Sequence, residues 1–297
     1  MMRIAEAEGG ERRHGWRRVA LLLGTMILAS AVSVSATEVC DIVEKETDAF
    51  GMSADMDPQA LQDLIDEGMR VVNLDDEGAF CALWVPRDYG KVAPARVLVL
   101  LHGSDGSAYA EIQDELDYAM DYCYALVAVQ WWDPAEDVYL NALQTYDVID
   151  LALRYLQATY GADPSRSALV AFSRGSAQSF EITYWDRLLG NEYFVLTIAH
   201  SGGIPTICPH LFVQRLLAGE LGREPFSGTR FFLYCGMEDE EWGTQQCLQM
   251  HHAEEIVIAY GGTIVEFVED LHGAHLGYRL SPGHQLRAIQ TFLGLTL

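Results

Sequence analysis

Short apolar runs alternate with longer helical patterns from residue 79 to residue 294. Runs such as ARVLVLLH (95–102), YALVAVQWW (124–132) and SALVAF (167–172) are continuously apolar, without the alternation of a half-exposed strand. Such runs are typical of strands that are buried on both faces of a parallel sheet. Strands that alternate with helices indicate βαβ units. The chain is therefore predicted to be an α/β protein whose central sheet is mostly parallel, with helices on both faces.

The other expected elements follow the same alternation. Further strands are predicted at 79–86, 193–199, 229–235 and 262–268, and helices at 57–70, 108–123, 140–161, 245–262 and 283–294. Because ligands bind beyond the carboxyl ends of the strands in open parallel sheets, functional side chains are expected at that edge. The segment 205–226 has two interpretations, a small cap over this edge or the crossover helix of a βαβ unit.

The N-terminal segment has the pattern of a secretory leader. Arginines cluster before an apolar stretch (19–36), which ends in the small residues Val34-Ser35-Ala36. This pattern predicts a signal peptide over residues 1–36, cleaved after Ala36, and an uncleaved membrane anchor is the alternative. No linker-like stretch divides the rest, so residues 37–297 are expected to form one domain, secreted or periplasmic.

The composition limits the partners. The chain has 43 acidic and 19 basic residues, a net charge of −24. Because this charge repels phosphate groups and anionic lipids, we expect no nucleic-acid binding, and no stable membrane association once the leader is removed. Six cysteines in an exported protein permit disulfides. The pairings Cys40–Cys81 and Cys208–Cys247 are predicted because these residues lie in expected loops or at strand ends.

The run ALVAFSRGSAQSF (168–180) leads from a strand through a tight turn into a helix, and Ser173 lies at the turn. Ala171-Phe172-Ser173-Arg174-Gly175 is a variant of G-x-S-x-G, the nucleophile elbow, in which small residues two before and two after the serine allow the sharp turn. A second match, Ala199-His200-Ser201-Gly202-Gly203, also follows a strand, but Pro205 prevents an immediate helix. We therefore favour Ser173 over Ser201 as a nucleophile.

Partners for such a serine follow three other expected strands. After 95–102, His102-Gly103 begins a glycine-rich loop in which the Ser104 N–H joins the Arg174 N–H as an oxyanion donor, and His102 orients the loop rather than acting as a base. After 229–235, Asp239 is the predicted acid, with Glu238 as the alternative. After 262–268, His275 is the predicted base, with His272 as the alternative. The order serine, acid, histidine is that of the α/β-hydrolases.

These motifs identify a family resemblance. The chain resembles the α/β-hydrolase superfamily, and YGADPSRSALVAFSRGSA (160–177) is most similar to secreted esterases of the polyhydroxybutyrate-depolymerase and feruloyl-esterase type. IAHSGG (198–203) is similar to a turn that follows the next strand in those enzymes. The chain departs from them at Ala171, where glycine is usual, and at Arg174, which adds a cation beside the acyl site. The resemblance implies the α/β-hydrolase fold and a serine hydrolase.

The leading hypothesis is a secreted hydrolase of small or polymeric carboxylic esters, which uses Ser173, His275 and Asp239 and needs no cofactor or metal. A peptidase of the same fold and a non-catalytic binding protein on a hydrolase scaffold are the alternatives. His251 and Glu255 share a helix face, but a solvated acidic face explains them better than a metal site. Three tryptophans near strand ends are candidate walls of an acyl pocket or ordinary packing residues: Trp131, Trp132 and Trp242.

Overall fold

The computed structural model describes residues 43–45, 57–73, 80–134, 136–205, 210–240 and 246–297. The predicted signal peptide, residues 1–36, lies outside these ranges and stays a prediction. Within the described ranges, no helix combines the length and the apolar character that crossing a membrane requires.

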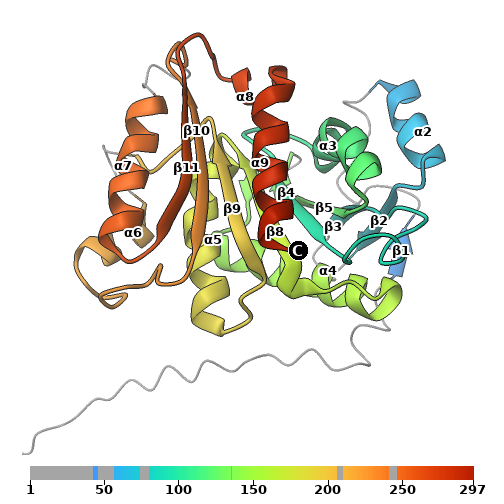
Figure 1. The fold of residues 1–297 in the computed structure, drawn as a ribbon, viewed down its shortest axis with the longest axis horizontal. Coiled ribbons are helices and arrows are strands. Elements are labelled where there is room, and N and C mark those ends of the chain that lie inside the picture. Colours follow the sequence, from blue (N-terminus) through green and yellow to red (C-terminus); the bar gives the residue numbers. More distant parts are fainter. Residues whose placement is uncertain (1–42, 46–56, 74–79, 135, 206–209, 241–245) are drawn as a thin grey trace, which may run out of the picture. The chain divides into compact units, whose positions relative to one another are not determined.

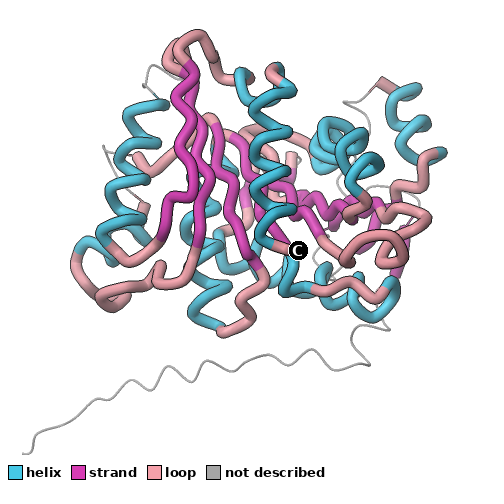
Figure 2. Tube along the Cα trace, in the orientation of Figure 1, coloured by secondary structure: helices cyan, strands magenta, loops and turns pink. Residues whose placement is uncertain are grey.

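One large sheet forms the centre of the described structure (Figures 1 and 2). Its strands lie in the order β1-β2-β3-β5-β4-β8-β9-β10-β11. From β5 to β11 every neighbouring pair is parallel, whereas β1, β2 and β3 are joined by antiparallel pairs and β3 is antiparallel to β5. The strands are β1 Val43–Lys45, β2 Arg70–Asn73, β3 Phe80–Trp84, β4 Val97–Leu101, β5 Ala125–Gln130, β8 Ser167–Phe172, β9 Phe194–His200, β10 Arg230–Gly236 and β11 Thr263–Asp270.

Helices cover both faces of this sheet, which confirms the predicted fold class. One face packs against α2 (Pro58–Asp66), α3 (Ala108–Tyr122) and α9 (Pro282–Leu295), and α9 crosses in front of β8 and β9 in Figure 1. The other face packs against α4 (Ala142–Tyr160), α5 (Arg174–Leu189), α6 (Leu211–Leu217) and α7 (Gln246–Ala259). Successive residues of β4 show why continuous apolar runs are needed: Leu98 and Leu100 face the first set of helices, and Val99 and Leu101 the second.

The ends of the helices follow local signals. Asn141 and Gln144 form a capping box at the start of α4, and Gly161 ends the helix in the left-handed conformation, with a φ of 73°. The helix predicted at 57–70 was too long, because α2 ends at Asp66 and Gly68 takes a φ of 99°. The chain then turns into β2, a strand that the sequence analysis missed.

Two further segments differ from the expectations. The predicted strand 124–132 ends at Gln130, and a small hairpin of β6 (Trp132–Asp133) and β7 (Val138–Tyr139) follows it. In the segment 205–226, α6 packs its apolar face into the core beside α5 and α7, so this helix belongs to the connection from β9 to β10.

One predicted disulfide pairing is wrong. Cys247 at the start of α7 pairs with Cys235 in β10, not with Cys208. The two residues are only 12 positions apart, and their Cα atoms are brought to 5.0 Å where α7 begins to pack on β10. Cys40 and Cys208 lie outside the described residues, so the Cys40–Cys81 pairing stays a prediction.

Candidate active site

Ser173 lies at the sharp turn between β8 and α5. Its φ of 52° and ψ of −115° fall outside the regions that non-glycine residues favour. The turn is held by a hydrogen bond from the Ser173 N–H to the His200 carbonyl of β9, at 3.0 Å. Gly175 lets the first turn of α5 cross the end of β4, because a Cβ at this position would lie 2.6 Å from the His102 carbonyl oxygen. The local structure is that of a nucleophile elbow.

The structure brings the three predicted side chains together. Ser173 Oγ lies 2.9 Å from His275 Nε2, and His275 Nδ1 lies 2.8 Å from Asp239 Oδ2. Because a carboxylate only accepts hydrogen bonds, Asp239 favours the tautomer with the proton on Nδ1, which leaves Nε2 to accept the serine proton. The Asp239 carboxylate is fully buried, whereas the His275 side chain keeps 19% of its surface exposed.

Two adjoining loops position the acid and the histidine. Asp239 follows β10, and His275 lies between β11 and α8 (Gly277–Leu280). The Glu238 N–H donates to the Gly273 carbonyl at 2.9 Å, which joins the loops side by side. Gly236 is needed at this junction, because a Cβ there would lie 2.2 Å from the Gly273 carbonyl oxygen. The spacing between acid and histidine is therefore set by backbone contacts between neighbouring strand ends.

The predicted oxyanion donors also lie at this edge. Ser104 lines a cavity of about 780 Å³ together with Ser173 and His275. Ser104 and Arg174 line a second cavity of about 390 Å³. Within the described part of the chain, neither the Ser104 nor the Arg174 backbone N–H donates to a protein acceptor. Both groups are therefore available to an oxygen atom placed at Ser173.

Comparison with known proteins bears on the fold. No family model and no curated protein sequence matches this chain. Among solved structures, a fungal esterase from Rhizomucor miehei is 15% identical over 76% of this chain and 82% of its own, with a TM-score of 0.56. EstE1, a thermophilic carboxylesterase cloned from a metagenomic library, is 13% identical over 82% of this chain and 99% of its own, with a TM-score of 0.56. The chain has the α/β-hydrolase fold. A Pyrococcus horikoshii acylaminoacyl peptidase shares it, with 14% identity and a TM-score of 0.51 over 74% of this chain and 39% of its own.

In this fold, the alternative serine, acid and histidine have surroundings that differ from those of the predicted residues. His272 is exposed, and its Nδ1 lies 3.3 Å from Glu238 Oε1, so the two alternatives contact each other instead of Ser173. Ser201 is buried, and its Oγ has no hydrogen-bond partner in the described ranges. Of the two histidines, only His275 is in hydrogen-bond contact with Ser173 in the described structure.

A layer of aromatic and charged side chains supports the histidine, and the sequence analysis missed it. The Phe172 ring packs on the His275 ring with centroids 5.0 Å apart. The guanidinium carbon of Arg279 lies 4.2 Å from the centroid of the same Phe172 ring. Arg279 is in turn paired with Glu111 and Asp114, at 2.6 Å each. These contacts join β8, α3 and α8, which are distant in sequence, so no local pattern signals them.

The predicted role of His102 agrees with its surroundings. The ring is buried and stacked on Trp131, and its Nδ1 lies 2.7 Å from the Gly103 carbonyl oxygen. Burial lowers the pKa of His102 to about 4, so the ring is neutral at neutral pH. It holds the loop that carries Ser104. Of the other tryptophans, Trp132 packs on Tyr139, and Trp242 lies outside the described residues.

The structure pairs His251 with carboxylates other than that of Glu255, the residue that shares its helix face in the sequence. His251 instead contacts Glu269 at 2.8 Å and Glu254 at 3.5 Å. His251 and Glu269 do converge with Cys247, within 4.8 Å, but this sulfur belongs to the disulfide and is not a thiolate ligand.

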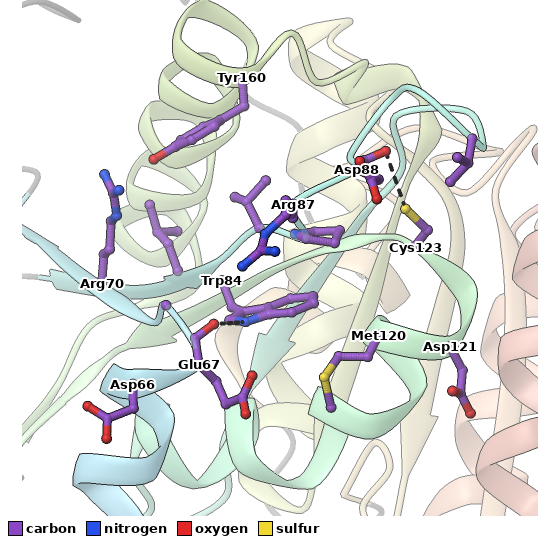
Figure 3. Close-up of a pocket in the computed structure, with 15 residues that line it drawn as sticks. Asp66, Glu67, Arg70, Trp84, Arg87, Asp88, Met120, Asp121, Cys123 and Tyr160 are labelled. Atoms are coloured by element: carbon purple, nitrogen blue, oxygen red, sulfur yellow. Dashed lines mark hydrogen bonds between the residues drawn. The ribbon is translucent and has the colours of Figure 1, made fainter.

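Another cavity, of about 680 Å³, lies at the opposite edge, near the amino end of β5 (Figure 3). Trp84 forms part of its wall and donates its Nε1–H to the Glu67 carbonyl at 2.9 Å. Cys123 lines this cavity and carries a thiol, a group that can act as a nucleophile when it is ionised. Burial, followed by the charge of Asp88, raises the pKa of this thiol and so disfavours the reactive thiolate. With no histidine among the lining residues to act as a base, this cavity lacks the chemistry of the Ser173 edge.

Proposed function

We propose that this protein is a serine hydrolase that cleaves carboxylic esters through an acyl-enzyme. The observation that carries the proposal is the continuous chain of contacts from the buried Asp239 carboxylate through His275 to Ser173 Oγ at a nucleophile elbow. A hydroxyl, an imidazole and a carboxylate in this order form the unit that activates a serine in acyl transfer.

The mechanism follows from the positions of these groups. Ser173 Oγ attacks the ester carbonyl carbon while its proton moves to His275 Nε2, and Asp239 stabilises the imidazolium that forms. The carbonyl oxygen becomes an oxyanion that accepts hydrogen bonds from the Ser104 and Arg174 N–H groups. The C–O bond to the alcohol then breaks, and His275 protonates the leaving oxygen. Water, deprotonated by His275, attacks the acyl-enzyme and releases the acid and free Ser173.

The proposal extends to the N-terminal segment and to the compartment in which the protein acts. We propose that residues 1–36 are a signal peptide and that residues 37–297 form the hydrolase domain, which acts outside the cytoplasm. The Cys235–Cys247 disulfide supports this, because such bonds persist in oxidising compartments.

Labelling with a fluorophosphonate, which reacts with activated serines, tests the proposed nucleophile. The wild-type protein should be labelled, Ser173→Ala should not, and Ser201→Ala should be labelled like the wild type. The same proteins should then be compared on p-nitrophenyl esters of rising chain length, a feruloyl ester and a peptide amide. Labelling that persists in Ser173→Ala would refute the proposal. Turnover of the amide alone would favour the peptidase alternative, and a folded protein that neither reacts nor turns over any substrate would favour the binding protein.

A further inference from the structure

The Arg174 side chain lies beside the proposed nucleophile on a platform made by Tyr139. Its guanidinium carbon is 3.6 Å from the centroid of the Tyr139 ring, which is a cation–π contact. The ring is anchored in turn, because the Tyr139 hydroxyl donates to Asp105 Oδ1 and accepts from the Asp105 N–H, both at 3.0 Å. Trp131 and Trp132 pack against the same ring. The charge of Arg174 is thus held in one place by the β6–β7 hairpin.

This cation has no carboxylate partner within ion-pair distance among the described residues, although acidic residues far outnumber basic ones. Two carboxylates, those of Asp105 and Asp137, line the cavity of about 390 Å³ together with Arg174. Each accepts a hydrogen bond from an aromatic side chain instead: Asp105 from the Tyr139 hydroxyl, and Asp137 from Trp132 Nε1 at 3.4 Å. A guanidinium has five N–H donors and no acceptor, so the Arg174 donors remain available to a ligand in the cavity.

The proposed mechanism assigns the two sides of Ser173 to the two parts of an ester. Because His275 protonates the leaving oxygen, the alcohol part lies on the His275 side, in the cavity of about 780 Å³. Its lining includes Phe172 and the exposed side chains of Leu276 and Leu280, which suit an apolar alcohol. The acyl part then lies on the Arg174 side, in the cavity of about 390 Å³. A further pocket, of about 270 Å³, shares Arg174 and Tyr139 with this cavity.

We infer that Arg174 forms an anion subsite for the acyl group, and that the preferred substrates are esters whose acyl part carries a second, free carboxylate. A carboxylate matches the planar donors of arginine through charge-assisted hydrogen bonds. Since Arg174 directly follows Ser173, the carboxylate must be only a few carbons from the scissile carbonyl, as in monoesters of short dicarboxylic acids. The inference rests on the proposed function, because it places the acyl group by the Ser173 mechanism.

The test compares monobutyl glutarate with butyl pentanoate, which has the same five-carbon acyl chain without the charge. Butanol release gives kcat/KM for each ester, and the ratio of the two values measures selectivity for the carboxylate. The wild-type ratio should favour monobutyl glutarate and fall with added salt. In Arg174→Gln the ratio should fall by about tenfold to a hundredfold, the range expected for one charge-assisted pair, and Arg174→Lys should lie between.

Arg230→Gln is the matched control, because Arg230 is an exposed arginine at the first residue of β10, the end of the strand away from Asp239, and its loss should leave both kcat/KM values unchanged. A wild-type ratio near one, or a ratio that Arg174→Gln does not change, would refute the anion subsite while leaving the serine hydrolase intact. If neither ester is turned over and the fluorophosphonate does not label Ser173, the proposed function itself fails, and the subsite with it.

Discussion

Replacing Gly175 by alanine tests whether the close crossing of α5 and β4 is what holds Ser173 in place. A Cβ on Gly175 would lie 2.6 Å from the His102 carbonyl oxygen and 2.9 Å from that of Leu101. Both are backbone atoms at the end of a central strand, and the side chains around them are fully or almost fully buried. Since β4 is fixed between β5 and β8, the first turn of α5 must move instead.

The size of this movement sets the expected effect. Restoring an ordinary contact of about 3.4 Å requires a shift of ~0.8 Å in the elbow. The Ser173 Oγ–His275 Nε2 distance is 2.9 Å, so a shift of this size removes the hydrogen bond or bends it strongly. Misplacement of reacting groups by about 1 Å lowers rates by roughly 100-fold, which is the decrease we expect in kcat/KM. Overpacking costs about 1–3 kcal/mol of stability, partly offset by the higher helix propensity of alanine, by up to about 1 kcal/mol.

The control is the same substitution in another helix. Gly294 lies in α9, and a Cβ there would have no atom within 4 Å apart from its chain neighbours and the backbone of its own helix. Gly294→Ala should keep full ester turnover and raise the free energy of unfolding in urea by up to about 1 kcal/mol. If Gly175→Ala behaved like Gly294→Ala in both turnover and urea unfolding, the crossing at β4 would not be the reason for a small residue at 175.

Two other substitutions test the charges around the site. Asp239→Asn should lower kcat by about 10⁴-fold with an unchanged circular dichroism spectrum, because an amide no longer favours the His275 tautomer that accepts the serine proton; activity near wild type would contradict this. Burial, followed by the charge of Glu111, raises the pKa of Glu115 to about 8 from its ordinary 4.5. The folded protein then binds this proton between about pH 4.5 and 8 and the unfolded chain does not, so stability falls as pH rises through this range. Glu115→Gln should remove this loss, on the order of 2–5 kcal/mol by pH 8, and parallel curves of unfolding free energy against pH for the two proteins would refute the assignment.

The parallel strands and the edge of the site could be predicted because both depend on local sequence. Each predicted parallel strand overlaps an observed one, and SALVAF (167–172) coincides with β8. Once the strands are parallel, residues that follow β8, β10 and β11 must meet at one edge, which is why Ser173, Asp239 and His275 could be selected together. The short strand β2 was missed because it has only four residues and follows a helix that was predicted to continue through Arg70.

The features that could not be predicted depend on contacts between distant segments. The disulfide partner of Cys247 is set by how α7 packs on β10, and six cysteines permit many pairings. The platform under Arg174 comes from a hairpin of two-residue strands, for which Trp132-Asp133 and Val138-Tyr139 have no distinctive pattern. Both features depend on tertiary packing, and no local pattern in the sequence indicates such packing.

The second elbow-like sequence, AHSGG (199–203), shows how packing around one serine can produce a false match. A Cβ on Gly202 would lie 2.2 Å from the Ser173 carbonyl oxygen, and the Ser176 hydroxyl donates to the Gly202 carbonyl. The glycine after Ser201 is therefore required by the elbow beside it, whose Ser173 N–H donates to the His200 carbonyl. Ser201 itself is buried, and no described histidine contacts its hydroxyl. Gly202 thus serves the close contact between the two turns, whereas Gly175 serves the crossing of α5 over β4, so the two elbow-like sequences have different causes. Of the two serines, only Ser173 has a histidine side chain within hydrogen-bond distance in the described structure.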